Sequence, residues 1–292
     1  MVCKKTYVRS HQGIKEKREQ IWFRKWITEG YSLRQLCQQS HWSHSKLKRI
    51  KKYWLDQEPP APNIRLKNHQ HLVFDGTYFS QKDCLMIFWD SRLHQSLTSR
   101  VASKESYLNT ISWFKKLKGQ GLSPVSITMD GQTQVIKAIG ETWPDCLLQR
   151  CLYHIQRQSE MWLRRYPKTN LAFELKLITQ QLSKIKDTKQ KDFWWKQFQD
   201  WKQKHSTSIK LLSSTDKVES DIIRAYRMIE NAYPNMFHYL DNQHIPSTSN
   251  GVEGYFSHLK RLYRQHAGLR RPNLKNYLLW YVYFKRINLT RN

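Results

Sequence analysis

The sequence predicts an α/β fold: a mixed five-stranded sheet, split by an all-helical insertion and preceded by a small helical domain. Three observations lead to this prediction. Apolar runs typical of strands begin at residue 71 and then alternate with helical patterns. Residues 159–245 carry helical patterns alone, and residues 1–58 contain three short helical segments separated by turn signals.

Length and charge narrow the possible partners. The chain has 292 residues, enough for two or three compact units, and a formal net charge of +27. Such an excess favours a polyanionic partner, either nucleic acid or an anionic membrane. No segment approaches the roughly 18 apolar residues of a membrane span, and the N-terminus lacks a signal-peptide core. Five scattered cysteines suit reduced thiols. We therefore expect a soluble, cytoplasmic protein that meets nucleic acid and no membrane.

The first 58 residues are predicted to form three helices. The first, over residues 15–29, stops at Gly30. Ser32 and Gln35 have the spacing of a capping box, which predicts the start of the second helix. Ser43 can cap the third. Short helices joined by tight turns are typical of a helix-turn-helix domain.

The third of these helices is strongly basic. A cation density of this kind suits the major groove of DNA and its flanking phosphates, although a solvated basic face on a small bundle is the alternative. The expected DNA-binding side chains on this helix are Lys46, Lys48, Arg49, Lys51 and Lys52. Consecutive prolines then predict a linker over residues 59–68.

The order of elements after the linker predicts a ribonuclease-H-like core. Three strands, a helix, a strand, a helix and a fifth strand follow one another between residues 71 and 151. We expect residues 69–158 to form the first part of this core, residues 159–245 a helical insertion, and residues 246–292 its last part with a basic C-terminal helix. Within the insertion, Phe193, Trp194 and Trp201 fit helical spacing, so packing is favoured over stacking on a DNA base.

Two aspartates occur in matching settings. Asp75 in "LVFDG" and Asp130 in "ITMDG" each follow an apolar run and precede glycine, so both are expected at or near strand ends. An ordinary Asp-Gly turn is the alternative for either one alone. Two carboxylates placed side by side repel each other unless metal ions hold them, so the pair favours a Mg²⁺ site.

A third carboxylate comes from the predicted helix within residues 247–269. Glu253 lies on its polar face, ahead of Lys260 and Arg264, which could hold a phosphate backbone. The alternative is a capping box in which Asn250 caps the helix and Glu253 satisfies a backbone N–H.

These residues together resemble the Mutator-like bacterial insertion-sequence transposases. The resemblance covers about residues 70 to 270 and includes "CLYH", which matches the C-x-x-H signature of that group. It implies Asp75, Asp130 and Glu253 as an Asp-Asp-Glu catalytic triad that holds two Mg²⁺ or Mn²⁺ ions. It implies that Cys151 and His154 support the active site. Without the resemblance, a core cysteine and a hydrogen-bonded histidine would be favoured, and zinc is not expected.

The function implied is transposition. Such an enzyme cleaves phosphodiester bonds at the ends of the element and joins the 3′-OH to target DNA. Because two ends must be held together, a homodimer or higher oligomer is expected, associated with the bacterial nucleoid. Two other readings stay open: a domesticated or truncated transposase that regulates by binding DNA, and a ribonuclease-H-like nuclease or resolvase that cuts without joining.

Overall fold

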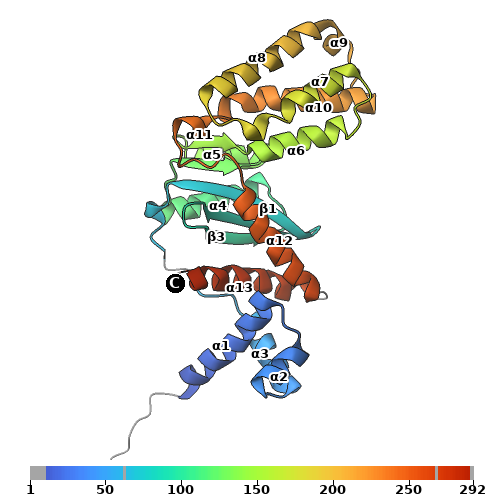
Figure 1. Ribbon diagram of the computed structural model, residues 1–292. Coiled ribbons are helices and arrows are strands. Elements are labelled where there is room, and N and C mark those ends of the chain that lie inside the picture. The colour runs from blue at the N-terminus through green and yellow to red at the C-terminus, as the bar shows by residue number, and fades with distance from the viewer. Residues whose placement is uncertain (1–10, 62–63, 267–268, 290–292) are drawn as a thin grey trace, which may run out of the picture.

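The computed structural model describes residues 11–61, 64–266 and 269–289, and the chain forms an elongated stack (Figure 1). A bundle of α6 to α10 lies at one end, the sheet lies in the middle, and α1 to α3 lie at the other end, next to α13. Within the described residues, no helix combines the length and apolarity needed to cross a bilayer.

Three N-terminal helices form as the sequence predicts, and the first begins at residue 11, ahead of the predicted residue 15. They are α1 (His11–Glu29), α2 (Leu33–Ser40) and α3 (His44–Leu55). Gly30, with a φ of +74°, ends the first helix in a conformation that favours glycine. Ser32 and Gln35 form both bonds of the predicted capping box, and the Ser43 hydroxyl accepts from the Lys46 N–H.

The sheet is mixed and contains five strands in the order β3-β2-β1-β4-β5. Strands β1 to β3 form an antiparallel meander, and β4 and β5 run parallel to β1. The strands are β1 (His71–Ser80), β2 (Asp83–Asp90), β3 (Gln95–Ala102), β4 (Ser126–Met129) and β5 (Leu147–Arg150). The mixed α/β class and the five strands expected from the sequence are thus confirmed.

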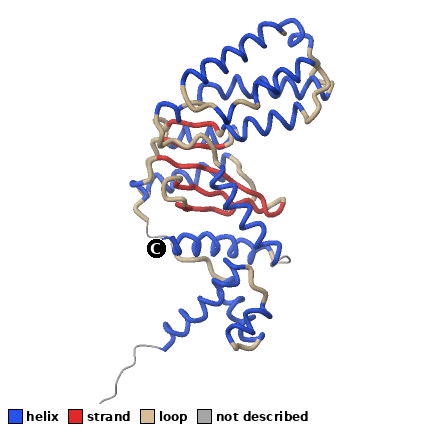
Figure 2. Tube along the Cα trace, viewed as in Figure 1, coloured by secondary structure: helices blue, strands red, loops and turns tan. Residues whose placement is uncertain are grey.

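Helices cover both faces of the sheet (Figure 2). On one face, Leu72, Phe74 and Phe88 pack against α4 (Tyr107–Gly119) and α5 (Thr133–Thr142). On the other face, the alternate residues Val73 and Ile87 pack into a core shared with α12 (Asn250–Gln265) and α13 (Arg271–Leu289). Successive side chains of a strand point to opposite faces of the sheet, so neighbouring residues of β1 and β2 belong to different cores.

The core behind α12 and α13 extends into the N-terminal helices. Phe23, Trp26 and Leu47 belong to the same buried cluster as Trp280 and Tyr281 of α13. The Trp280 indole N–H also donates to the backbone carbonyls of Trp54 and Gln57, at 2.9 Å each. Helix α13 is therefore packed between the sheet and the N-terminal bundle, and its aromatic side chains are largely buried.

The helical segment after β5 has a core of its own. Trp194, Phe198 and Trp201 are buried there, whereas Phe193 is 62% exposed. This confirms packing for the two tryptophans and corrects it for Phe193. The helices are α6 (Leu152–Leu163), α7 (Asn170–Thr179), α8 (Thr188–Lys204), α9 (Ser206–Leu211), α10 (Lys217–Ala232) and α11 (His238–Asp241). Short 3-10 turns are η1 (Leu66–Asn68), η2 (Leu182–Lys184) and η3 (Tyr233–Asn235).

Candidate active site

Asp75 lies in the middle of β1, and the expectation of a strand end there is wrong. Strand β1 continues to Ser80, with Asp75 opposite Ile87 and Gly76 opposite Met86 on β2. The Asp-Gly pair is therefore not a turn. The antiparallel partner β2 is long enough to keep β1 extended past the glycine, which explains the difference from the sequence pattern.

Asp130 directly follows β4, as predicted. The parallel ladder pairs His71 with Ser126 and Val73 with Thr128, and continuing this register brings Asp130 level with Asp75. Asp130 accepts hydrogen bonds from the N–H groups of Gly131 and Gln132, at 2.6 and 3.1 Å. The two carboxylates thus come from neighbouring strands at one level of the sheet.

Glu253 reaches the sheet on the first turns of α12. The segment before this helix is fixed by two hydrogen bonds, from the Thr128 hydroxyl to the Pro246 carbonyl and from the Leu152 N–H to the Ser247 carbonyl. Ser249 is the N-cap residue and forms no side-chain cap bond, so the capping-box alternative for Glu253 is wrong. The carboxylate is left available for other partners.

Cys151, His154 and Ser249 form a small network beside Glu253. The Ser249 hydroxyl lies 3.4 Å from Cys151 Sγ and 3.3 Å from His154 Nδ1, and the Ser249 N–H donates to the same sulfur. His154 Nε2 lies 3.2 Å from Glu253 Oε1. That separation fits an ion pair, but the groups are not aligned as a hydrogen bond, and the buried Oε1 has no hydrogen-bond partner among the described residues. The network connects the start of α6 to the start of α12.

The charges of these groups influence one another. Burial is the main cause that raises the pKa of Asp75, to about 7; Asp130 and Glu253 add to the rise, whereas His154 and the Gly76 N–H oppose it. Burial lowers the pKa of His154, but Cys151, Asp75 and Asp130 outweigh it and raise the value to about 9. The carboxylates therefore lie close enough to repel one another, beside one protonated imidazole.

A fourth carboxylate, Glu105, joins this group, although no sequence pattern indicated it. Burial, followed by the charges of Asp130 and Asp75, raises the pKa of Glu105 to about 7. Its carboxylate lies against the backbone of Gly76, where an added Cβ would come within 1.5 Å of Glu105 Oε1. Glu105 follows β3 in a loop without a strand-Asp-Gly pattern, so its position depends on the tertiary fold.

Arg150, at the end of β5, completes the charged surroundings of Asp130. Its Nε donates to the Asp130 carbonyl at 3.0 Å, and its guanidinium fills the space beside Gly131, whose φ is +123°. A Cβ at Gly131 would lie 2.0 Å from Arg150 Nη2. Glycine is therefore required after Asp130 both by the backbone conformation and by this guanidinium.

The donor chemistry of the site suits a hard divalent cation. Asp75, Asp130 and Glu253 offer carboxylate oxygens, which Mg²⁺ and Mn²⁺ prefer, and Glu253 Oε1 is a buried acceptor without a hydrogen bond. Across the described residues, however, no three acidic, cysteine or histidine side chains converge as a ready-made metal site. The residue types fit a metal, and the ion pair between His154 and Glu253 would have to adjust to it.

The basic residues predicted to bind DNA differ in their surroundings. Lys48 and Arg49 of α3 are exposed, while Lys46 lies 3.5 Å from the centroid of the Trp42 ring. Lys52 is paired with Asp56 at 2.5 Å, and burial lowers the pKa of Lys51. On α12, Arg264 is exposed and Lys260 is half-buried.

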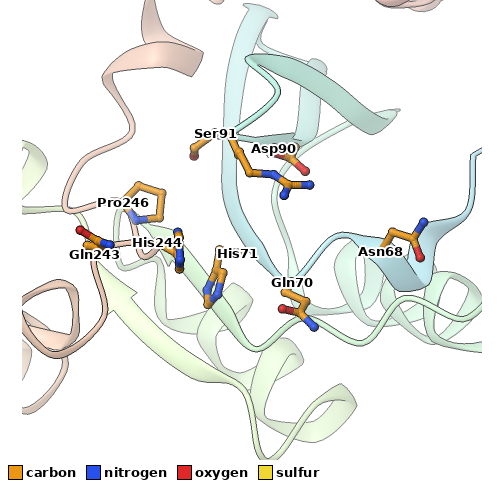
Figure 3. Close-up of a pocket in the computed structure, with 9 residues that line it drawn as sticks. Asn68, Gln70, His71, Asp90, Ser91, Gln243, His244 and Pro246 are labelled. Atoms are coloured by element: carbon orange, nitrogen blue, oxygen red, sulfur yellow. The ribbon is translucent and has the colours of Figure 1, made fainter.

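A polar hollow of about 420 Å³ lies at the start of β1 (Figure 3). His71 and His244 face each other there, with ring centroids 5.8 Å apart. The Asp90 carboxylate at its edge already accepts from His69 Nδ1 and the Leu93 N–H. His71 precedes Asp75 by four residues, roughly 13 Å along a strand, so this hollow is separate from the carboxylate group.

Comparison with known proteins identifies the family. The model of the family described as "Transposase, Mutator family" matches residues 87–261, more than half of the chain. A curated relative, "Transposase for insertion sequence element ISRM5" from Rhizobium meliloti (strain 1021), is 31% identical over 106 residues. That match covers 35% of this chain and only 26% of the relative's length. The chain belongs to the Mutator family of transposases, as the sequence resemblance implied.

Proposed function

We propose that this chain cuts DNA at the ends of an insertion sequence and joins the new 3′-OH to target DNA, with Asp75, Asp130 and Glu253 as the catalytic carboxylates. The observation that carries the proposal is the shared level of Asp75 and Asp130 on neighbouring parallel strands, with Glu253 coupled to Asp75. Family membership supports the reaction class.

The sheet supports a ribonuclease-H-like assignment. Its order β3-β2-β1-β4-β5, with a three-stranded meander followed by two parallel strands, is the order expected of such a core. The first acid lies on the central strand and the second follows the neighbouring strand. Asp75 is held by strand pairing and the Asp130 carboxylate by the N–H groups of Gly131 and Gln132, which favours precise placement of a reacting phosphate.

Asp75, Asp130 and Glu253 would hold the divalent ions, two Mg²⁺ or Mn²⁺. When bound, such ions make water or a 3′-OH more nucleophilic and stabilise the charge on the leaving oxygen. His154, protonated because its pKa is about 9, orients Glu253 and adds positive charge where a phosphate would approach. The Cys151 and Ser249 contacts fix the position of the His154 ring.

DNA recognition is assigned to the N-terminal helices as a helix-turn-helix unit. Lys48 and Arg49 project from α3 into solvent, so they can reach base edges or phosphates in a major groove. Lys46, Lys51 and Lys52 would add charge near the backbone, and Lys260 and Arg264 would hold DNA along α12. Two or more copies of the chain are needed to hold both ends of an element.

The test compares Asp75→Asn, Asp130→Asn and Glu253→Gln with the unaltered protein on DNA that carries the ends of the element. We expect each variant to bind DNA with unchanged affinity and to lose cleavage and strand transfer by at least about a thousandfold in Mg²⁺. Asp145→Asn, an exposed carboxylate of the same core, is the matched control and should remain fully active.

The products separate the competing functions. Joined product from the unaltered protein supports a transposase, whereas nicked DNA without joined product supports a nuclease or resolvase. Binding without any cut, in Mg²⁺ and in Mn²⁺, supports a regulator. Full activity in one of the three variants would remove that residue from the triad.

A further inference from the structure

A second hollow, of about 210 Å³, lies where the ends of β2 and β3 meet α12 and α13. Two aromatic rings line it, Trp89 from β2 and Tyr255 from α12, with centroids 5.2 Å apart. The volume is below the roughly 300 Å³ typical of sites for drug-sized ligands, so it suits one flat ring system. Aromatic walls of this kind are used to stack single nucleobases.

Two buried hydroxyls line the same hollow. The Ser96 side chain is 2% exposed, its hydroxyl lies beside that of Tyr255, and neither hydroxyl has a further hydrogen-bond partner among the described residues. A hydroxyl can donate one hydrogen bond and accept two, so this pair keeps hydrogen-bonding capacity for a ligand. Two hydroxyls that can each donate and accept are suited to the polar edge of a base.

The hollow also contains a buried cation without a matching anion. Arg286 is 9% exposed, and no carboxylate of the described residues lies within 4.0 Å of its guanidinium. Burial lowers the pKa of Arg286, while the phenols of Tyr283 and Tyr255 oppose this effect. Lys285 and His94 also line the hollow, and no acidic side chain is among its described lining residues. A buried guanidinium of this kind is best offset by a phosphate.

The hollow is close to the carboxylate group. Asp75 of β1 pairs with Ile87 of β2, and Trp89 follows Ile87 by two residues on β2. The backbone positions of Asp75 and Trp89 are therefore about 8 Å apart. Tyr255 follows Glu253 by two residues on α12, and a Cβ at Gly251 would lie 3.5 Å from the Trp89 indole nitrogen.

We propose that this hollow binds one unpaired nucleotide of the DNA substrate: the base packs against the paired rings of Trp89 and Tyr255, and Arg286 binds its phosphate. The inference rests on the proposed function, since it places the nucleotide within a few residues of the cleavage site. Ser96 and the Tyr255 hydroxyl contact the base edge, and Lys285 and His94 add charge at the rim. A strand end opened at the cleavage site would supply such a nucleotide.

The experiment uses the full chain and two probes, a single-stranded oligodeoxythymidylate of about ten nucleotides and a duplex of equal length. The single-stranded probe carries 5-iodouracil for photo-cross-linking. Arg286→Met should weaken single-strand binding about tenfold and duplex binding much less, because one phosphate contact is lost. Tyr255→Phe should weaken single-strand binding a few-fold. Lys189→Met, on the exposed surface of α8, makes the same charge change and should leave both affinities unaltered.

The stability of the Arg286→Met variant shows whether Arg286 has a binding role or a structural one. Arg286→Met replaces a buried, unpaired charge with an apolar chain of similar length, so its urea midpoint should be unchanged or higher. A lower midpoint together with weaker binding would show that Arg286 is structural and would overturn the inference, as would cross-links that map outside Trp89 and Tyr255. Asp75→Asn should cross-link normally, so an inactive but cross-linking variant tests the catalytic proposal separately. If the triad variants lose cleavage and strand transfer as expected but Arg286→Met binds the single-stranded probe normally, only the nucleotide site is refuted.

Discussion

At the scale of single residues, the carboxylate group is costly to the fold. Asp75 is held within a hydrogen-bonded strand, close to Asp130, Glu253 and Glu105, and the charge of His154 opposes the rise in its pKa. A site selected for stability would not gather four acids in one place. Such a concentration of carboxylates, with raised pKa values for Asp75 and Glu105, is typical of functional sites, where the arrangement serves a ligand.

Gly76 offers a direct test of this crowding. Gly76→Ala should lower the free energy of unfolding by about 1–2 kcal/mol, because the new Cβ meets the Glu105 carboxylate and forces that side chain away. Urea unfolding measures the effect. Gly140→Ala on α5 is the matched control: nothing lies within 4 Å of its Cβ, so alanine should stabilise the helix.

The double variant Gly76→Ala/Glu105→Ala identifies the cause. If the Glu105 carboxylate is the obstacle, the double variant should recover most of the stability that Gly76→Ala loses, a coupling typical of residues in contact. A double variant as unstable as the sum of its parts would point to strain in β1 itself and contradict the contact.

At the scale of elements, α12 connects the candidate site to the N-terminal helices. Its first turns carry Glu253, and beyond its end the His266 ring packs at a tilt against Trp26, with centroids 4.3 Å apart. His266 Nε2 also donates to the Trp26 carbonyl at 2.9 Å. The helix that carries the third carboxylate is thus fixed at its far end to α1.

This contact predicts a pH dependence. Burial is the main cause that lowers the pKa of His266 below 6.5, and Lys51 adds to it, while the carbonyl acceptors oppose it. As the pH falls, His266 therefore takes up a proton at a higher pH in the unfolded chain than in the folded chain. Stability from this neutral ring is fully present above about pH 6.5 and is lost as the pH falls towards the lower folded-state pKa.

The measurement is urea unfolding from pH 8 to pH 5. His266→Phe keeps an aromatic contact with Trp26 and loses the hydrogen bond, so it should cost about 1 kcal/mol at pH 8 and show a smaller loss of stability on acidification. His44→Gln, at the exposed start of α3, is the control and should follow the unaltered protein. If the free energy of unfolding falls with pH equally in His266→Phe and the unaltered protein, the His266 ring is not the titrating group.

At the scale of the whole molecule, the described residues form three buried clusters. One joins the N-terminal helices, α12, α13 and one face of the sheet, a second lies between the other face of the sheet and α4 and α5, and a third fills the helical segment between β5 and α12, the proposed insertion. The third cluster is joined to the sheet by hydrogen bonds such as that from Gln149 Nε2 to the Met236 carbonyl. The N-terminal bundle should therefore unfold with the sheet, whereas the insertion should form a separate unit.

Calorimetry can resolve the two units. Phe198→Ala in the insertion and Trp280→Ala in α13 each remove a fully buried ring and should cost about 3–5 kcal/mol. We expect each variant to lower a different thermal transition. Phe193→Ala, exposed on the same helix as Phe198, should change neither transition by more than about 1 °C. Equal shifts of one single transition would show that the chain unfolds as one unit.

The sequence predicted local features well because their causes are local. The capping box of Ser32 and Gln35, the stop at Gly30 and the apolar run at the start of β1 each depend on residues a few positions apart. A local pattern gave a wrong prediction at Asp75: the Asp-Gly pair indicated a strand end, but it lies inside β1. Pairing with β2, which no short segment of sequence encodes, decides that β1 continues.

By itself, then, the sequence determined the order of elements, the α/β class, the positive charge and the family, because periodicity, composition and motif spacing are written along the chain. Only the tertiary structure decided that Glu105 joins Asp75, that Ser249 links Cys151 to His154, and that Arg286 lies beside Trp89 and Tyr255. These contacts join residues up to about two hundred positions apart. They depend on strand register and helix packing, which a sequence pattern does not specify.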